Sequence, residues 1–335
     1  MTEKGLPTLV VDQRWKGQHG IARYSAEVLK RLDQDYVGLR SQISPTNPMD
    51  AFSPSRRGWP KGSVIYTPGF NSGFTSTTQI ITVHDLIHLE NQAEQSPLKK
   101  LYYDLIVKPA IVKAGTVFTV SETSAAQIRK WVSNDSVKAV VTGCGVSPEF
   151  RLEGKSDNRG KGRFLYVGSI KPHKNVSLLL QAISHNKDHE LIIVTSDVAQ
   201  ATSLVSDVGV SQQVTILSGL TDAELSALYR STQALVMPST LEGFGLPAAE
   251  AIACGATVLY WSGCESVHEI VGTYGTALTS STDSTEWSDT MGNISGSPRV
   301  KNTPDALWQA TYSWDSVGDI VNTQLRETLR QGPRS

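Results

Sequence analysis

The sequence has few cysteines, no long apolar run and almost no net charge. Its three cysteines, Cys144, Cys254 and Cys264, form no CxxC pair, so neither a disulfide framework nor a zinc site is expected. No stretch approaches the roughly 20 apolar residues that span a bilayer. The apolar run near the N-terminus is too short for the core of a signal peptide. These absences predict a cytoplasmic protein in a reducing compartment.

The charge balance argues against nucleic acid as a partner. The chain has 31 Lys and Arg against 32 Asp and Glu, a net charge of −1, whereas nucleic-acid-binding domains usually carry a basic face. Its 27 Gly and 15 Pro are too few for a collagen-like or low-complexity chain. The length predicts about two globular domains.

Short β-branched runs alternate with amphipathic segments of helix length, which predicts an α/β fold with largely parallel sheets. In the first half the expected strands are Thr8–Val11, Tyr36–Leu39, Val64–Tyr66, Gln79–Val83, Thr116–Val120 and Val137–Val141, and the expected helices are Ile21–Leu32, Ser96–Lys113 and Ser121–Trp131. The second half has expected strands at Phe164–Gly168, Leu191–Thr195, Val214–Leu217, Ala234–Met237 and Thr257–Tyr260, with helices at Ser177–Ser184, Ala199–Val208, Thr221–Arg230 and Pro247–Cys254. The polar stretch 151–163 between the halves predicts a linker.

The strongest motif is PSTLEGFGLPAAE, residues 238–250, which follows a buried strand and opens a helix. Glycines allow a backbone to approach a ligand closely, and a helix N-terminus offers free N–H groups to an anion. Glu242 and Glu250 would accept hydrogen bonds from hydroxyl groups on two parts of one phosphate-linked ligand, such as a sugar and a ribose.

Two other interpretations of this motif stay open. Glu250 would complement the helix dipole and Gly245 would make a turn without any ligand. Alternatively, Gly243, Gly245 and Ala248, with Glu265 further on, imitate a dinucleotide fingerprint. That fingerprint belongs after the first strand of its domain, whereas this motif follows the fourth expected strand of the second half.

Several segments together resemble one family. Glu242 and Glu250, in EGFGLPAAEAIACG, are accompanied in order along the chain by GIARY (20–24), TVHDLI (82–87), TVSETS (119–124), GCGVSPEF (143–150) and LYVGSIKPHKN (165–175). The pattern resembles retaining nucleotide-sugar glycosyltransferases of the GT-B fold, glycosyltransferase family 4 (group 1). Within that family, the HDxI and GIxRY segments are similar to those of bacterial mannosyl- and rhamnosyltransferases of surface polysaccharide assembly.

The resemblance implies two Rossmann-like, doubly wound α/β domains facing a central cleft. Residues 1–155 would bind the acceptor, residues 156–315 the nucleotide-sugar donor, and the C-terminal helix of residues 316–335 would cross back onto the first domain. The implied reaction transfers a hexose or deoxyhexose from a nucleotide diphosphate sugar, here a co-substrate, to a growing glycan or lipid-linked acceptor. No metal or other cofactor is implied; the only DxD, Asp33–Asp35, is assigned none.

The resemblance also implies roles for individual residues. The catalytic residues would be His84 near the transferred sugar, Lys174 on the diphosphate and Glu242 on the sugar hydroxyls. Glu250 would bind the ribose, and the remaining donor-binding positions would be Gly20, Ser169, His173, Gly243, Phe244, Gly245 and Leu246. Ser169 and His173 depart from the family, because many members have arginine at the first position and relatives often have arginine at the second.

The acceptor side is defined less sharply. Arg23 would either supply the missing cation or pair with an acidic residue such as Asp12. Arg56, Arg57 and Trp59 lie in an irregular, proline-containing stretch, residues 44–62. They would face a lipid-linked diphosphate or an anionic membrane, or the stretch would be an ordinary exposed loop. Peripheral contact with the cytoplasmic membrane is the associated hypothesis.

Two other functions remain open. The chain would be a catalytically silent GT-B scaffold if Ser169 and His173 had removed activity, although His84, Lys174, Glu242 and Glu250 are intact. It would be a GT-B nucleotide-sugar epimerase or hydrolase if the donor were converted without an acceptor. A glycosyltransferase would release nucleotide only with an acceptor, an epimerase or hydrolase would convert the donor without one, and a silent scaffold would do neither.

Overall fold

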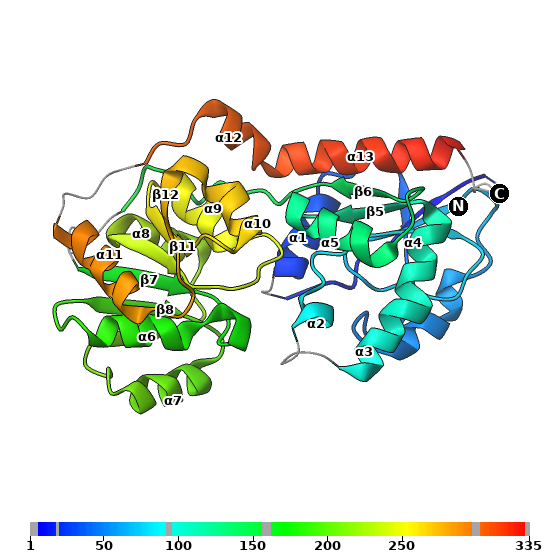
Figure 1. The fold of residues 1–335 in the computed structure, drawn as a ribbon. Helices are drawn as coiled ribbons and strands as arrows, with labels where there is room; N and C mark the ends of the chain where they lie inside the picture. The colour runs from blue at the N-terminus through cyan, green and yellow to red at the C-terminus, as the bar shows by residue number, and fades with distance from the viewer. Residues whose placement is uncertain (1–5, 18–19, 92–95, 156–161, 297–301, 332–335) are drawn as a thin grey trace. The chain divides into compact units, whose positions relative to one another are not determined.

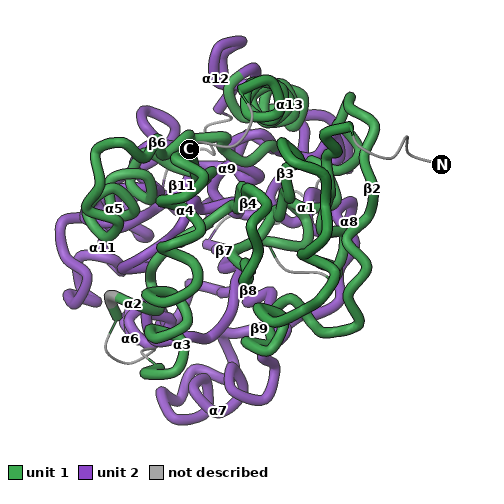
Figure 2. Tube along the Cα trace, turned by 90° about the vertical axis from the view of Figure 1, so that its right-hand side faces the viewer, with its two compact units in different colours: residues 1–145, 311–335 green, residues 146–310 purple. Residues whose placement is uncertain are grey.

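The protein divides into two compact units. A computed structural model describes residues 6–17, 20–91, 96–155, 162–296 and 302–331. The first unit comprises Met1–Gly145 and Thr311–Ser335, and the second comprises Val146–Ala310 (Figure 2). The break lies ten residues before the predicted one at 155. Arg151 and Lys155, in the expected linker, belong to the second unit, since their carbonyl oxygens accept hydrogen bonds from Arg230. Residues 156–161 of that linker lie outside the described residues.

The sheet of the first unit is parallel. Its strands are β1 (Leu9–Val11), β2 (Tyr36–Gly38), β3 (Val64–Thr67), β4 (Thr78–Ile81), β5 (Thr116–Thr119) and β6 (Lys138–Val141). Four of them pair in the order β2-β1-β3-β4, and a bridge from Thr82 to Phe118 links β4 to the β5–β6 pair. The order reverses between β1 and β3. In sheets of this kind, the carboxyl ends at such a reversal form a crevice where ligands bind.

The helices of the first unit are α1 (Gly20–Leu29), α2 (Ile87–Glu90), α3 (Pro97–Tyr102), α4 (Lys108–Ala114), α5 (Glu122–Val132) and α13 (Trp314–Gln331). The expected helix Ser96–Lys113 is one helical run, but it contains a π-helical turn at Tyr103–Val107. Pro109 follows this turn and has no N–H to give to the helical ladder, so a locally widened turn fits here. Ser121 caps α5 by accepting a 3.0 Å hydrogen bond from the Ser124 N–H.

Helix α13 packs on α1, within the first unit (Figure 1). Asn322 donates to the Arg31 carbonyl at 2.7 Å, and Arg31 donates to Asp315 at 2.7 Å. Gly145 and Trp314 are so close that a Cβ on the glycine would lie 2.3 Å from the Trp314 nitrogen. The C-terminal helix therefore begins two residues earlier than residue 316 and completes the fold of the first unit.

The second unit has a six-stranded parallel sheet in the order β12-β11-β10-β7-β8-β9. The strands are β7 (Arg163–Val167), β8 (Glu190–Val194), β9 (Val214–Leu217), β10 (Ala234–Met237), β11 (Thr257–Trp261) and β12 (Gly275–Leu278). Counted within the unit, this is the 3-2-1-4-5-6 order of dinucleotide-binding sheets, which reverses between the first and fourth strands. Those strands are β7 and β10.

Helices cover both faces of this sheet. Figure 1 shows α6 (Val176–Ser184) and α7 (Val198–Val208) on one face and α8 (Asp222–Ser231), α9 (Leu246–Ala253) and α10 (Glu265–Val271) on the other. Helix α11 (Ser284–Gly296) packs beside α6, and α12 (Ala306–Thr311) joins the two units in sequence. A capping box begins α8: the Thr221 and Glu224 side chains each accept a hydrogen bond from the other residue's backbone N–H. Helices α10, α11 and α12 and strand β12 were missing from the sequence prediction.

Candidate functional site

The loops after β7 and β10 emerge side by side at the strand reversal of the second unit, because these strands pair in parallel. The first loop, residues 168–175, contains a short 3₁₀ turn, Pro172–Lys174. The second, residues 238–245, leads into α9. Thr240 joins them by donating its backbone N–H to the His173 carbonyl at 2.7 Å. The two predicted donor motifs therefore meet at one place in the fold.

Lys174 and Glu242 form the charged centre of this place. The Lys174 Nζ lies 2.6 Å from both carboxylate oxygens of Glu242. The Lys174 and Glu242 side chains are 19% and 10% exposed, respectively. Ser266 of α10 holds the loop by donating to the Glu242 carbonyl at 2.8 Å. The pair is thus anchored on both sides, yet remains within reach of a ligand.

The backbone before α9 is shaped by glycine. Gly245 has a φ of +110°, and a Cβ there would lie 3.1 Å from Val267 of α10, so both conformation and space favour glycine. The preceding residue Phe244 is buried, whereas Leu246 begins the helix. With Gly243, these residues bring the N-terminus of α9 to the same strand edge as Lys174.

Glu250 is a buried carboxyl group in α9, 4% exposed. Its Oε2 accepts a 3.0 Å hydrogen bond from the Tyr229 hydroxyl of α8. A buried carboxyl group needs hydrogen-bond partners, and the Tyr229 hydroxyl supplies one to Glu250. Tyr229 gave no signal in the sequence, where it is simply an apolar position of a helix.

The two positions that depart from the family are part of the β7 loop. Tyr166 donates its hydroxyl to the Ser169 carbonyl at 2.6 Å, which fixes the loop backbone. His173 is buried, 6% exposed. Lys174 is the partly exposed cation of this loop.

In the first unit, His84 lies after β4 and beyond the bridge at Thr82. Its Nε2 is 3.0 Å from the Pro68 carbonyl, and its ring meets that of Tyr24 edge-on, with centroids 4.8 Å apart. Burial raises the pKa of Tyr24 to about 12, so its hydroxyl stays neutral. Gly20 is exposed at the first position of α1, and Arg23 is half-buried in the same helix.

The expectation that Arg56 faces an acceptor or a membrane is wrong. Arg56 is fully buried, 0% exposed. It pairs with Asp50 at 2.6 Å and donates to Gln79 at 3.1 Å. A buried guanidinium needs such partners, since an unpaired buried charge is costly. The cation therefore holds the segment that precedes β3 instead of presenting a charge to solvent.

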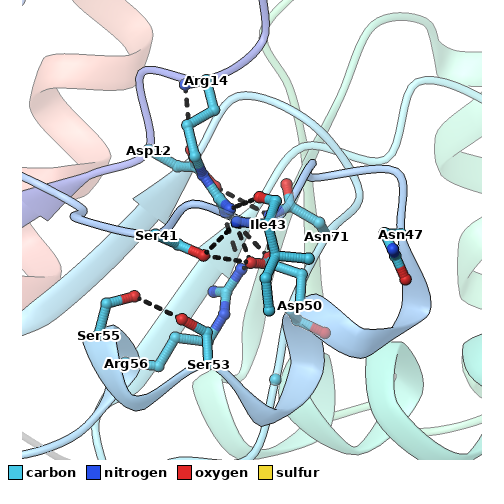
Figure 3. Close-up of polar contacts among 12 residues, drawn as sticks. Asp12, Arg14, Ser41, Ile43, Asn47, Asp50, Ser53, Ser55, Arg56 and Asn71 are labelled. Atoms are coloured by element: carbon cyan, nitrogen blue, oxygen red, sulfur yellow. Dashed lines mark hydrogen bonds and ion pairs between the residues drawn. The ribbon is translucent and has the colours of Figure 1, made fainter.

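Arg56 belongs to a larger polar cluster at the carboxyl ends of β1 and β3 (Figure 3). Arg14 pairs with Asp12 and Asp50, at 2.6 Å each. Asn71 donates to the same two carboxylates, at 2.8 and 3.0 Å. Burial alone would raise the pKa of Asp50, but the hydrogen bond from Arg14 and the charge of Arg56 outweigh it and lower this pKa to about 2. In the sequence, an acidic residue directly after a strand, Asp12, is the feature from which this cluster could have been anticipated.

The other acceptor candidates have different surroundings. Arg57 is exposed and donates its Nε to the Phe74 carbonyl at 3.3 Å. Trp59 is half-buried; its indole N–H donates to the Ser55 carbonyl at 2.9 Å, and its ring packs on Val10, Leu39 and Ile65. Residues 44–62 are thus a folded segment with two short 3₁₀ turns, Pro48–Phe52 and Pro54–Arg56, not an ordinary loop.

Asp33, in the DxD, pairs with Arg326 at 2.7 Å and is thus engaged by α13. Within the described ranges, no three His, Cys, Asp or Glu side chains gather as metal ligands would. Nor does any helix in that part of the chain have the length and apolarity to cross a bilayer.

Known proteins resemble both the sequence and the fold. Residues 149–303 match the family described as glycosyl transferases group 1. The O-antigen chain mannosyltransferase RfbU of Salmonella typhimurium is 31% identical over 259 residues, 75% of this chain and 70% of that protein. An MMP α-(1→4)-mannosyltransferase of Mycolicibacterium hassiacum is 30% identical over 71% of this chain and 62% of its own length.

Among solved structures, sucrose-phosphate synthase from Thermosynechococcus elongatus aligns with a TM-score of 0.74 at 18% identity, over 97% of this chain and 100% of that one. The chain has the GT-B fold. It belongs to the group 1 glycosyltransferases, and the protein is a glycosyltransferase.

Proposed function

We propose that this protein is a retaining hexosyltransferase of surface polysaccharide synthesis. It transfers mannose, or the deoxyhexose rhamnose, from a nucleotide diphosphate sugar to a growing glycan or lipid-linked acceptor in the cytoplasm. Two relatives, an O-antigen chain mannosyltransferase and an α-(1→4)-mannosyltransferase, support mannose as the transferred sugar.

The observation that carries this proposal is the Lys174–Glu242 pair beside the N-terminus of α9. Lys174 binds the donor diphosphate, and Glu242 accepts hydrogen bonds from the transferred sugar. In the free protein these groups neutralise each other at 2.6 Å. The arriving diphosphate takes over the cation, and the sugar hydroxyls take over the carboxylate, so neither charge is left without a partner.

The rest of the donor site follows from the geometry of α9. Gly245 and Leu246 direct backbone N–H groups at the diphosphate, Gly243 and Phe244 complete the donor-binding loop before them, and Glu250 accepts a hydrogen bond from the ribose, positioned by Tyr229. Ser169 and His173 shape the loop that carries Lys174. The second unit is in this proposal the donor domain, and the first unit, completed by α13, is the acceptor domain.

Departure of the nucleoside diphosphate places negative charge on its terminal phosphate. Lys174 and the α9 N–H groups stabilise that charge in the transition state, which lowers the barrier without requiring a metal. We infer front-face attack: the acceptor hydroxyl attacks the anomeric carbon from the side that the phosphate leaves, and the leaving oxygen accepts its proton. His84 orients the transferred sugar, Gly20 is a further donor-binding position, and Arg23 lies at the acceptor side.

Peripheral membrane contact is part of the proposal. Leu98 and Leu101, three residues apart in α3, are 64% and 53% exposed and lie on one face of that helix, and Leu105 in the π-helical turn that follows is 60% exposed. Lys99 and Lys100 are exposed beside them. An apolar stripe next to cations suits the surface of an anionic bilayer.

The donor site is tested by thermal shift with UDP, GDP, dTDP and ADP and their sugars. One nucleotide should raise the melting temperature of the wild type, because it binds only the folded state, and should not raise that of Glu250→Ala. Proton NMR of the product should then show the anomeric configuration of the donor. No shift with any nucleotide would contradict the donor site, and an inverted product would contradict retention.

The membrane contact needs a separate measurement. Sedimentation with phosphatidylglycerol vesicles should recover the wild type and lose Leu98→Asp/Leu101→Asp. The control Leu6→Asp, which changes another exposed leucine, should still sediment. Equal sedimentation of all three proteins would remove α3 from the proposal.

A further inference from the structure

A pocket of about 650 Å³ lies beside the edge strand β2 in the first unit. It is lined by Val37, residues 40–43, residues 53–55, Arg57 and Trp59. This volume lies in the range of small-molecule sites. Its charged lining residues are Arg40 and Arg57, and no Asp or Glu is among them.

The cluster of Asp12, Arg14, Asp50, Arg56 and Asn71 holds one wall of this pocket, since it bonds residues 41 and 43 of the lining; Figure 3 shows Ser41 and Ile43 beside it. Ser41 donates to Asp50 at 3.0 Å, and the Arg14 guanidinium donates to the carbonyl of Ile43. Because residues 41 and 43 are both tied to the cluster, the loop after β2 keeps its shape without a ligand.

The opposite wall is held by the same cluster. The 3₁₀ turn Pro54–Arg56 places Arg56 in the interior against Asp50, and the hydroxyls of Ser53 and Ser55 lie 2.9 Å apart. The indole N–H of Trp59 donates to the Ser55 carbonyl, which fixes the aromatic ring. Both walls are therefore positioned in advance, which reduces the entropy lost on binding.

The charge of the pocket comes from its two arginines. In the cluster, Asp12 and Asp50 are balanced by Arg14 and Arg56. Arg40 and Arg57 are exposed, and neither forms an ion pair with any residue that the structure describes. Arg57 uses its Nε for the Phe74 carbonyl, which leaves the Nη groups for a ligand.

We propose that this pocket binds a phosphorylated sugar of the acceptor, with phosphate on Arg40 and Arg57 and the sugar ring on Trp59. Guanidinium groups bind phosphate oxygens through paired, charge-assisted hydrogen bonds. An aromatic face covers the apolar side of a sugar ring, and the serines offer hydroxyls. The inference rests on the proposed function, since it defines which acceptor that reaction uses.

Titration calorimetry of the full chain with glucose 1-phosphate tests this site. The variants Arg40→Gln and Arg57→Gln should each weaken binding about five- to tenfold, since one charge-assisted contact to phosphate is lost. The matched control is Lys61→Gln, which removes an exposed cation near Arg57 but outside the lining. It should change the affinity less than about twofold, as expected for a solvent-screened charge that does not line the pocket.

A second probe, farnesyl phosphate, distinguishes the source of the phosphate. Binding of glucose 1-phosphate that depends on both arginines assigns a sugar phosphate, free or lipid-linked. If farnesyl phosphate binds in an arginine-dependent manner and glucose 1-phosphate does not bind, the proposed sugar contact on Trp59 is overturned. If neither probe binds, or if Lys61→Gln weakens binding as much as Arg57→Gln, the pocket is not a phosphate site.

Failure here is distinguishable from failure of the proposed function. The nucleotide-induced shift in melting temperature depends on residues of the second unit, so Arg40→Gln and Arg57→Gln should leave it unchanged. A normal nucleotide shift without sugar-phosphate binding refutes the pocket alone. If no nucleotide raises the melting temperature of the wild type, the donor site itself is refuted.

Discussion

The two units place charged residues at the carboxyl ends of parallel strands in different ways. In the second unit, Lys174 and Glu242 pair at the reversal between β7 and β10, with side chains 19% and 10% exposed. In the first unit, Arg14, Asp12, Asp50 and Arg56 gather at the ends of β1 and β3, and all but Arg14 are fully buried. The same topological position thus holds an accessible pair in one unit and a buried cluster in the other.

We infer from this difference in exposure that the pair in the second unit serves ligand binding and the cluster in the first unit serves folding. A pair that is partly exposed can exchange its partner for a ligand at moderate cost, whereas buried ions lose several kcal/mol when one partner is removed. The buried cluster therefore stabilises its unit and shapes a neighbouring pocket, whereas the partly exposed Lys174–Glu242 pair is the one proposed to take part in chemistry. The following substitutions test this contrast.

The largest effect is expected from Arg56→Met, which leaves the buried carboxylate of Asp50 without a main partner. The free energy of unfolding should fall by about 3–5 kcal/mol, measured by calorimetry or guanidinium denaturation. The exposed neighbour serves as control: Arg57→Met should change stability by less than about 0.5 kcal/mol. Similar values for the two variants would contradict a structural role specific to Arg56.

Lys174→Met should lower kcat about 10²–10³-fold, since the transition-state charge on the leaving phosphate loses its cation. Stability should change far less than in Arg56→Met. Lys171→Met removes an exposed lysine three residues earlier in the loop and should keep kcat within about threefold. If both substitutions lower kcat equally, the general positive charge of the loop would explain the effect. A specific contact between Lys174 and the leaving phosphate would then be contradicted.

The pH dependence of stability should come partly from the first unit. The pKa of Asp50 is lowered to about 2, below the value of about 3.9 in an unfolded chain. Its contribution is therefore complete above about pH 4 and is lost as the pH falls from 4 to 2, by about 2 kcal/mol.

Guanidinium denaturation at several pH values between 5 and 2 measures this effect. Asp50→Asn should flatten the loss of stability in that window. The control Asp33→Asn, in an exposed ion pair with Arg326, should retain it. An unchanged slope in Asp50→Asn would assign the titration to other groups.

The smallest effect is expected from Tyr229→Phe. It removes one hydrogen bond to Glu250, worth about 1 kcal/mol, so nucleotide affinity should fall about three- to tenfold. Calorimetric titration with the nucleotide found by thermal shift measures this change. Tyr36→Phe, which loses a bond to Gln13 in the first unit, should bind normally. Unaltered binding by Tyr229→Phe would show that Glu250 does not need its neighbour.

Most helices were predictable from their helical periodicity, and most strands from short β-branched or apolar runs between them. Val64–Thr67 and Ala234–Met237 are β-branched or apolar and fully buried. Strand β12, Gly275–Leu278, was missed because GTAL has little β propensity; it forms by pairing with β11. The π turn before Pro109 was missed as well, because hydrophobic periodicity does not register one added residue per turn.

The sequence by itself determined the α/β class, the capping of α5 and α8, and the donor motifs, because these depend on residues close together in the chain. Only the tertiary structure decided which charges are available. Arg56 and Arg57 are neighbours in sequence, yet one is buried against Asp50 and the other lines a pocket. Likewise, Tyr229 and Glu250 meet only after β10 brings α8 and α9 together. The free energy of a charge depends on solvent and on partners distant in sequence, and folding alone brings those partners to it.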